Sequence, residues 1–231
     1  MSDIAGRDST LSPVAPKHDV PTGSPPIAPI PSIPSIPSTS AVTTEDYRVL
    51  RRVVRDRRTN LRIDPDRDID HSILLDLCEL ACWAPNHKLT EPWRFAVVRG
   101  AARATLGELT ARFQLASGDD DEARLNKTRK KYLRSAVVLL IASARSSDEA
   151  RRSEDRDAVA SGVQNVLLGA TALGINSYWG TGAITSAPAV KEFAGFGSED
   201  TIVASVYLGW PIGSVPTPNR RPPMKIGRAH V

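Results

Sequence analysis

The sequence predicts an α+β fold, and the pattern of its apolar residues carries this prediction. Four short runs rich in apolar and β-branched residues have the length and composition of β-strands, at residues 93–98, 134–143, 175–179 and 201–210. Between them lie longer segments whose apolar residues recur at helical spacing. A chain that mixes helices with about four strands in this way is typical of an α+β domain.

Length and composition bound the kind of protein. A chain of 231 residues suits one domain with a tail. The net charge is +4 and the pI about 9.3, but the basic residues are scattered among Asp and Glu. This distribution favours a mixed-charge surface over a nucleic-acid partner. Cys78 and Cys82 form neither a CxxC pair nor a zinc set, so we expect core thiols in a reducing compartment.

The sequence also bears on where the protein is found. No apolar run approaches the roughly 20 residues that a transmembrane helix needs. The N-terminus lacks the apolar core of a signal peptide. We therefore expect a cytoplasmic protein with no membrane partner.

Residues 1–43 are rich in proline, serine and threonine and contain the short repeat PIPSIPSIPS. Such a segment has too little apolar surface to offset the entropy lost on ordering. We expect a disordered, extended tail. Binding of this tail to a partner's aromatic groove stays open as an alternative.

The folded part begins with a helix that Thr44 caps, with acidic residues in its first turn. This helix ends in a basic run that includes Arg57, Arg58 and Thr59. Guanidinium groups match phosphate oxygens in a forked geometry, and a hydroxyl adds a further donor. The run is therefore a candidate phosphate site, and a solvated charged segment is the alternative.

The stretch ACWAPNHKLTEPWRF, residues 81–95, follows a second helix that Asp70 caps. Pro85 ends that helix, and the polar loop 86–91 leads into the strand that begins at Trp93. Two tryptophans, a histidine and a lysine thus lie on a tight connection between a helix and a strand. Polar groups on a loop between rigid elements are typical of a binding site.

The rest of the chain alternates helices and strands. Residues 101–116 form an amphipathic helix, and 117–131 a polar insert. The helical pattern at 155–173 has small residues that allow close packing, and Gly174 can end it. The following strand runs into a Gly-x-Gly turn, which by itself is weak evidence for a ligand site. A short helix spans 188–193.

The strings W-A-P-N-H-K and T-E-P-W-R-F, with Arg57-Arg58-Thr59 upstream, resemble the nitroreductase-like FMN-dependent flavoproteins. The likeness is to the branch with a His-Lys pair after Ala-Pro, and it covers residues 44 to about 223. It implies a nitroreductase-like sandwich, with a central mixed β-sheet flanked by helices. It also implies a homodimer that holds two FMN molecules at its interface.

The resemblance further implies which residues bind the cofactor. They are Arg57, Arg58, Thr59, Trp83, His87, Trp179, Gly180, Thr181 and Arg221. Thr59 stands where the family carries serine, so the hydroxyl is retained. The resemblance also links the end of one helix to binding of the pyridine nucleotide. These residues are Gly169, Ala170, Thr171, Ala172, Leu173 and Gly174. No metal site and no side-chain nucleophile are expected, because the flavin N5 carries the chemistry.

The function that the resemblance implies is that of an NAD(P)H-dependent FMN oxidoreductase. Hydride passes through the flavin to a nitroaromatic, a quinone or a similar electron-poor small molecule in ping-pong turnover. Two alternatives stay open. One is a flavin enzyme dedicated to a single metabolite, and the other is a flavin- or partner-binding protein without turnover.

The end of the chain departs from the family, whose members continue with an extension that embraces the partner subunit. Residues 226–231, IGRAHV, match the translation of a common sequencing-adapter sequence. We therefore expect residues 224–231 to be a non-native end. Sequencing of independent genomic DNA decides this.

Overall fold

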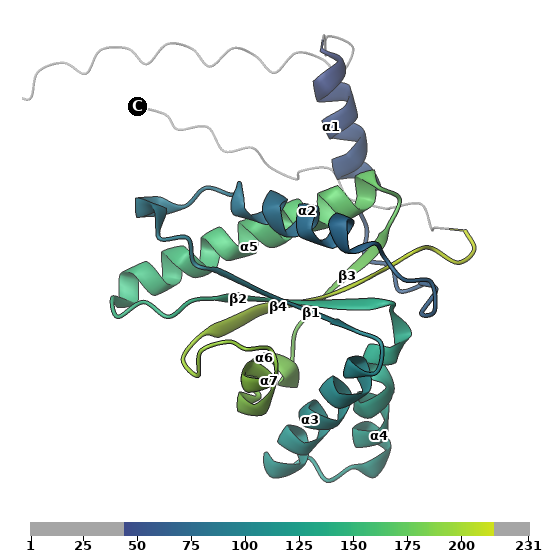
Figure 1. Ribbon diagram of the computed structural model, residues 1–231, viewed down its shortest axis with the longest axis vertical. Helices are drawn as coiled ribbons and strands as arrows, with labels where there is room; N and C mark the ends of the chain where they lie inside the picture. The colour runs from purple at the N-terminus through teal and green to yellow at the C-terminus, as the bar shows by residue number, and fades with distance from the viewer. Residues whose placement is uncertain (1–43, 215–231) are drawn as a thin grey trace, which may run out of the picture. The chain divides into compact units, whose positions relative to one another are not determined.

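A computed structural model of the chain describes residues 44–214 (Figure 1). The Pro-rich stretch 1–43, Arg221 and the stretch 224–231 lie outside the described residues. The expectations about them therefore stay predictions.

Four strands form one sheet, as the sequence predicted. They are β1 (Trp93–Arg99), β2 (Val137–Ser143), β3 (Asn176–Gly180) and β4 (Thr201–Gly209). The helices are α1 (Glu45–Asp56), α2 (His71–Cys82), α3 (Ala102–Ala116), α4 (Glu122–Lys131), α5 (Glu149–Ala172), α6 (Ala183–Ser186) and α7 (Pro188–Phe193). Two 3₁₀ turns, η2 (His87–Leu89) and η3 (Tyr132–Arg134), precede β1 and β2.

The sheet has the strand order β1-β2-β4-β3, and all three pairings are antiparallel. The expected mixed sheet is therefore wrong for the described residues. β2 and β3 run in the same direction, but β4 lies between them and is antiparallel to both. The parallel pairing in the described part of the chain is a single bridge between Thr59 and Ser177.

Helices cover both faces of the sheet (Figure 1). The odd-numbered residues of β2 from Val137 to Ile141 pack against α2 and α5, and the even-numbered ones from Val138 to Ala142 against the side of α3, α6 and α7. This alternation follows from the two-residue period of a strand. Both faces of β2 are buried, which explains its continuous apolar run.

The predicted helix caps are confirmed at two positions. The Thr44 hydroxyl accepts the Tyr47 N–H, and the Asp70 carboxylate accepts the Ser72 N–H. The helix expected from residue 155 begins earlier, at Glu149, because Asp148 caps it and its first turns are polar. The apolar pattern begins only where the helix meets the core.

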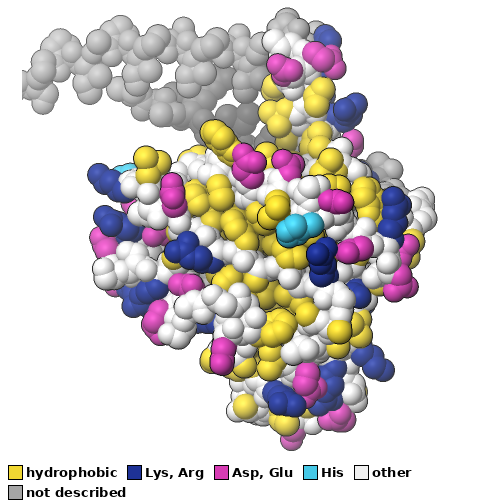
Figure 2. All heavy atoms as spheres, viewed as in Figure 1, with side chains coloured by type: hydrophobic (Ala, Val, Ile, Leu, Met, Phe, Trp, Pro, Cys, Tyr) yellow, Lys and Arg dark blue, Asp and Glu magenta, His cyan; other side chains and the backbone are white. Residues whose placement is uncertain are grey.

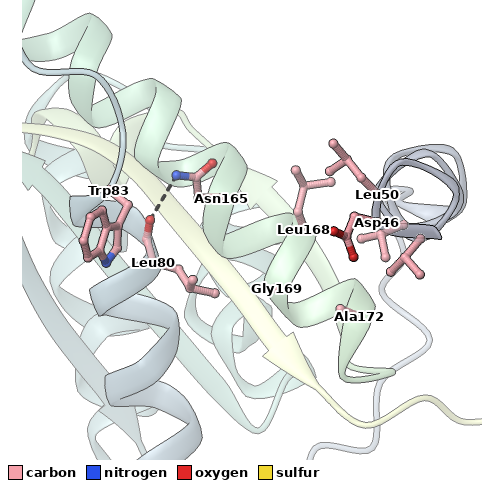
Figure 3. A pocket seen from close by; sticks show the side chains of 10 residues that line it. Asp46, Leu50, Leu80, Trp83, Asn165, Leu168, Gly169 and Ala172 are labelled. Atoms are coloured by element: carbon pink, nitrogen blue, oxygen red, sulfur yellow. Dashed lines mark hydrogen bonds between the residues drawn. The ribbon is translucent and has the colours of Figure 1, made fainter. Parts of the chain in front are cut away.

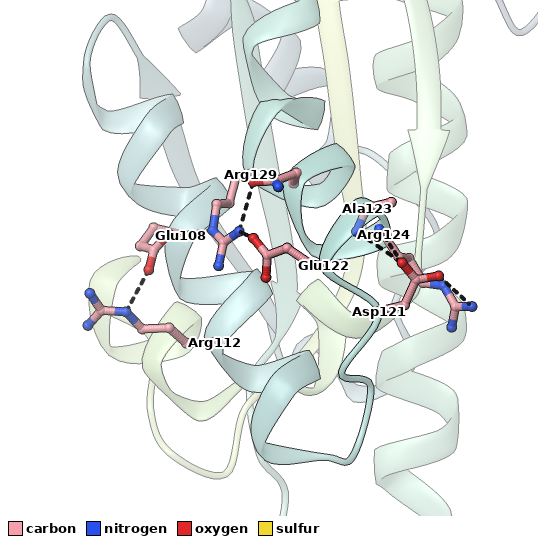
Figure 4. A network of polar contacts seen from close by, with 8 residues as sticks. Glu108, Arg112, Asp121, Glu122, Ala123, Arg124 and Arg129 are labelled. Atoms are coloured by element: carbon pink, nitrogen blue, oxygen red, sulfur yellow. Dashed lines mark hydrogen bonds and ion pairs between the residues drawn. The ribbon is translucent and has the colours of Figure 1, made fainter.

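The polar insert 117–131 contains α4, which pairs with α3 in a hairpin (Figure 4). Glu108 on α3 accepts hydrogen bonds from Arg112 at 2.8 Å and from Arg129 on α4 at 3.1 Å. These two guanidinium groups, Arg112 first, lower the pKa of the Glu108 carboxyl. A Cβ on Gly107 would lie 2.2 Å from the Arg129 carbonyl oxygen, so the glycine allows the two backbones to meet.

α5 lies against α2 at a similarly close distance. A Cβ on Gly162 would lie 2.6 Å from the Ala81 carbonyl oxygen and 2.9 Å from the Trp93 indole nitrogen. Trp93 is buried, with 8% of its surface exposed. The contact joins the backbones of two helices. A side chain at residue 162 could therefore be accommodated only by an unfavourable shift of one helix.

We expect Gly162→Ala to destabilise the protein. Alanine gains up to about 1 kcal/mol of helix propensity, but overpacking against a backbone carbonyl typically costs about 1–3 kcal/mol. The cost exceeds the gain in helix propensity, so the free energy of unfolding, measured by urea titration, should fall by about 1 kcal/mol. Gln164→Ala, at an exposed position of the same helix, is the control and should change it by less than about 0.5 kcal/mol. A Gly162→Ala protein as stable as the wild type would contradict this packing.

Candidate functional site

The phosphate-binding candidates lie along the outer edge of β3. Thr59 bridges Ser177, and the Asn60 N–H donates to the Ser177 carbonyl oxygen at 3.0 Å. The Asn176 side chain donates to the Arg62 carbonyl oxygen at 2.9 Å, which fixes the segment farther along. The structure thus sets the segment that contains Arg57, Arg58 and Thr59 at the start of β3.

The donors in this segment suit an anion. Arg58 is half-buried, with its Nε donating to the Asp56 carbonyl oxygen at 2.8 Å, and Thr59 is exposed. Asn60 is only 7% exposed, and its Nδ2 has no hydrogen-bond partner among residues 44–214. A buried amide without an acceptor is costly. Guanidinium groups, a hydroxyl and this orphaned amide together match the acceptors of a phosphate and a polyol chain.

Asn60 was missed in the sequence, where only its place directly after the Arg-Arg-Thr run marks it. Its burial arises from the pairing of the Asn60 backbone with β3, a contact between residues far apart in the chain.

The far end of β3 carries the second set of candidates. The Trp179 indole N–H donates to the Val203 carbonyl oxygen at 3.3 Å. The Trp179 side chain packs on the α2–α5 side of the sheet. A Cβ on Gly180 would lie 3.0 Å from the Ser205 hydroxyl oxygen, so packing on β4 explains the glycine. Thr181 is exposed just beyond the strand. These residues share one edge strand with the Arg57–Thr59 segment.

The loop after α2 presents the third set of candidates. Trp83 is 77% exposed, and the His87 Nδ1 lies 2.8 Å from the Glu154 Oε2 on α5. Three residues nearby have left-handed backbone angles without being glycine: Lys88, Leu89 and Glu91, with φ of 64°, 50° and 49°. Such residues cost about 1–3 kcal/mol each and gather at functional sites.

These sets do not come together in one chain. His87 contacts α5 at Glu154, whereas the Thr59 segment meets β3 just beyond the end of α5 at Ala172. From Glu154 to Ala172 the helix rises about 27 Å. That span is longer than an FMN molecule. His87 and the Thr59 segment therefore lie toward opposite ends of α5.

The six residues that the resemblance assigned to the pyridine nucleotide lie at the end of α5 and the turn after it. Ala170 is fully buried, and a Cβ on Gly169 would lie 2.8 Å from the side chains of Leu77 and Leu80. The Thr171 hydroxyl donates to the Leu167 carbonyl oxygen. Gly174 has a left-handed φ of 76° and ends the helix as predicted. Packing thus accounts for several of these residues.

An apolar groove of about 530 Å³ separates α1 from α2 and α5 (Figure 3). Its walls are mainly apolar side chains, among them Val49, Leu50, Val53, Leu80, Trp83 and Leu168. Figure 2 shows apolar side chains gathered over α1. α1 has no buried residue, and its apolar side chains remain open, with Leu50 54% exposed.

A basic hollow of about 520 Å³ lies on α4 and η3. It is lined by Arg124, Lys127, Thr128, Lys130, Lys131 and Arg134, and the sequence analysis did not single it out. Burial and then the neighbouring Arg134 charge lower the pKa of Lys131. η3 leads into β2, where Val137 pairs with Leu208, which in turn pairs with Ser177. Three strand spacings, about 14 Å, separate Val137 from Thr59, so both sets of cations lie at one end of the sheet.

The two cysteines differ from the expectation of core thiols. Cys78 is half-buried against the core, but Cys82 is exposed on the outer side of α2. Burial raises the pKa of Cys78 to about 11 and also raises that of Cys82, where Glu91 and Glu79 add to the effect. A raised pKa leaves little reactive thiolate at neutral pH.

Residues 44–214 hold no group of three His, Cys, Asp or Glu side chains arranged to bind a metal ion. None of the helices in this range is both long enough and apolar enough to cross a bilayer.

Comparison with known proteins decides the family. The model of the nitroreductase family matches residues 54–210. The chain belongs to the nitroreductase family.

Two bacterial relatives and one solved structure show how far the likeness extends. "Putative NAD(P)H nitroreductase YfhC" of Bacillus subtilis is 30% identical over 78% of this chain and 92% of the relative. "Putative NAD(P)H nitroreductase YdjA" of Escherichia coli K12 is 31% identical over 55% of this chain and 70% of the relative. A nitroreductase with bound FMN from Bacteroides fragilis has the same fold, with a TM-score of 0.63 at 20% identity, over 81% of this chain and all of that one.

Proposed function

We propose that this nitroreductase-family protein is an NAD(P)H-dependent FMN oxidoreductase. It passes hydride through the flavin N5 to a nitroaromatic, a quinone or a similar electron-poor small molecule in ping-pong turnover. The names of YfhC and YdjA supply the donor, and the B. fragilis structure supplies the cofactor. The observation that carries the proposal is the donor-rich segment Arg57–Asn60, paired to β3 and ending in an unsatisfied buried amide.

FMN, when bound, supplies reversible hydride acceptance, and the protein binds and orients it. We assign its phosphate to Arg57, Arg58 and Thr59, with the Asn60 amide as a further donor nearby. Arg221 remains part of this assignment; the described chain ends at Ser214, whose carbonyl oxygen accepts from Arg62 in the same region at 3.3 Å. Trp179, Gly180 and Thr181 line the flavin from the edge strand.

The cations of α4 and η3 complete the electrostatic environment of this end of the sheet. Negative charge builds up on a flavin as it is reduced, and preorganised cations stabilise developing charge. Among the cations that line the hollow, Arg124 pairs with Asp119 at 3.2 Å and Asp121 at 3.5 Å, whereas Lys131 lies beside the positive charge of Arg134. We include this hollow in the proposed site as a source of positive potential, not as a separate site.

The cofactor site requires a second copy of the chain. His87 is exposed beside Glu154 near the start of α5, whereas the Thr59 segment meets β3 beyond the end of that helix. We propose that each copy offers Trp83 and His87 to the flavin held by Arg57–Thr59 of its partner. The open apolar face of α1 and the groove beside it provide the surface on which the copies meet. The homodimer is thus a requirement of the proposed function.

The region from Gly169 to Gly174 spans the last turn of α5 and the turn that follows it. The fold already accounts for Gly169, Ala170 and Gly174, so their residue types do not require a nucleotide. Gly169 and Ala172 do line the groove beside α1. The groove beside α1 is already assigned to the contact between the copies, so a nicotinamide contact at residues 169–174 rests on the family resemblance alone.

The first test of the function is spectroscopic. The purified protein, loaded with FMN and freed of excess, should show flavin absorption bands that bleach on anaerobic addition of NADPH or NADH. Addition of a quinone should then restore the bands. Protein kept without a donor is the control for photoreduction. Bands that persist with both donors would contradict the oxidoreductase.

The second test concerns the dimer. Leu50→Glu puts a charge in the apolar face of α1, and burying an unpaired charge at an interface is unfavourable. We expect a monomer by light scattering, with FMN affinity reduced at least tenfold. Arg52→Glu is the control, because Arg52 is exposed two residues along the helix and on another face. It should remain a dimer, and a Leu50→Glu protein that stays dimeric and binds FMN normally would refute the assignment of this interface.

A further inference from the structure

The loop 86–91 holds an unfavourable backbone shape that its own sequence does not explain. Lys88, Leu89 and Glu91 have positive φ, although none of them is glycine, asparagine or aspartate. Leu89 is also 81% exposed, so burial of its side chain does not hold the shape. The contacts that keep this backbone in place must come from other residues.

A chain of hydrogen bonds provides those contacts. The Asn86 side-chain oxygen accepts the Glu91 N–H at 2.9 Å, and the Asn86 amide donates to the Thr90 hydroxyl at 3.0 Å. The Thr90 hydroxyl in turn donates to the carboxylate of Asp155 on α5 in a short hydrogen bond. The first two bonds close the loop on itself, and the third ties it to the core.

Asp155 is unusual for an acidic residue. It is 3% exposed, and the ion pairs of α5 in the described part of the chain involve its neighbours Glu149, Glu154 and Asp157 instead. A buried carboxylate without a cation is costly and survives only where hydrogen bonds replace water. Because burying the Asp155 carboxylate in a core helix is unfavourable, we expect this residue to have a role beyond packing.

Two successive carboxylates of α5 therefore hold the loop at two points. Asp155 takes the Thr90 hydroxyl, and Glu154 lies 2.8 Å from His87. Because His87 and Thr90 are three residues apart, holding both side chains also fixes the orientation of the loop. Held groups lose less conformational entropy on binding than free ones.

We propose that Asp155 is a positioning residue for the flavin site, acting through Thr90. It keeps the strained loop in the one shape that presents His87 outward. The inference rests on the proposed function, since the flavin of the partner copy is what the loop is presented to. Asp155 itself touches neither the cofactor nor the acceptor.

The test is a graded series at the Thr90–Asp155 hydrogen bond, with the FMN-loaded dimer as the sample. Thr90→Val keeps the shape and removes the hydroxyl. Asp155→Asn keeps the shape and an acceptor oxygen but removes the charge. Thr90→Ser keeps the hydroxyl. Asp157→Asn is the matched control, because it removes an exposed carboxylate from the same helix.

We expect the dissociation constant of FMN to rise at least tenfold in Thr90→Val and less in Asp155→Asn. Thr90→Ser and Asp157→Asn should stay within twofold of the wild type. The flavin midpoint potential should shift in the same order, because the loop lies at the flavin and affects its oxidised and reduced forms unequally. A purely structural hydrogen bond would lower the urea midpoint of unfolding without moving the potential.

Two outcomes would overturn the inference in different ways. If the wild type binds FMN and both Thr90→Val and Asp155→Asn keep its affinity and potential, the inference fails and the proposed function stands. If the wild type itself takes up no FMN, the proposed function fails and the inference falls with it. The two variants act from opposite ends of one bond, and Asp155→Asn leaves an acceptor for Thr90, so it retains the fold.

Discussion

Helix α5 can lie against α2 only because Gly162 and Gly169 have no side chains at the points of closest approach. This close contact brings α5 down onto the sheet and sets the distance between its two ends. At its beginning, Glu154 and Asp155 hold the loop that contains His87. Beyond its end, the chain turns at Gly174 into β3, where the Arg57–Asn60 segment is paired. The length of α5 therefore sets the distance between the His87 loop and the Arg57–Asn60 segment.

That length has a consequence for the assembly. A site divided between the two ends of a rigid helix is useful only if something else closes the gap. α1 leaves its apolar face uncovered among the described residues and stands next to the groove that includes Trp83. An uncovered apolar face of this kind is favourable only when a partner removes it from water. The proposed dimer thus accounts for two observations at once, the divided site and the open helix.

The sequence predicted what depends on local rules. The caps at Thr44 and Asp70, the end of α5 at Gly174 and the four strands all follow from short-range signals, and the structure confirms them. The α+β class followed from the pattern of apolar residues, and the family from short motifs at residues 57–59 and 83–95. The predictions of caps and helix ends were correct because these residues act through their own backbone or within one turn of a helix.

The features that were missed depend on contacts between distant segments. The antiparallel sheet results from β4 inserting between β2 and β3, which no single strand reveals. Asn60 and Asp155 are both buried by partners far away in the chain, so their burial has no local signal. The division of the site could not be seen either, because motifs in a sequence carry no distances. Only the rise of α5 shows that His87 and the Thr59 segment lie toward opposite ends of one helix.

The most direct test of this account is a mixed dimer. Arg58→Ala damages the half of the site on β3, and His87→Ala damages the half on the loop. Each variant alone should bind FMN weakly. A dimer with one Arg58→Ala chain and one His87→Ala chain, isolated through two different affinity tags, carries both lesions in one site and none in the other. Our account predicts one FMN per mixed dimer, bound with wild-type affinity. Weak binding at both sites would show that each site lies within a single chain and would contradict the account.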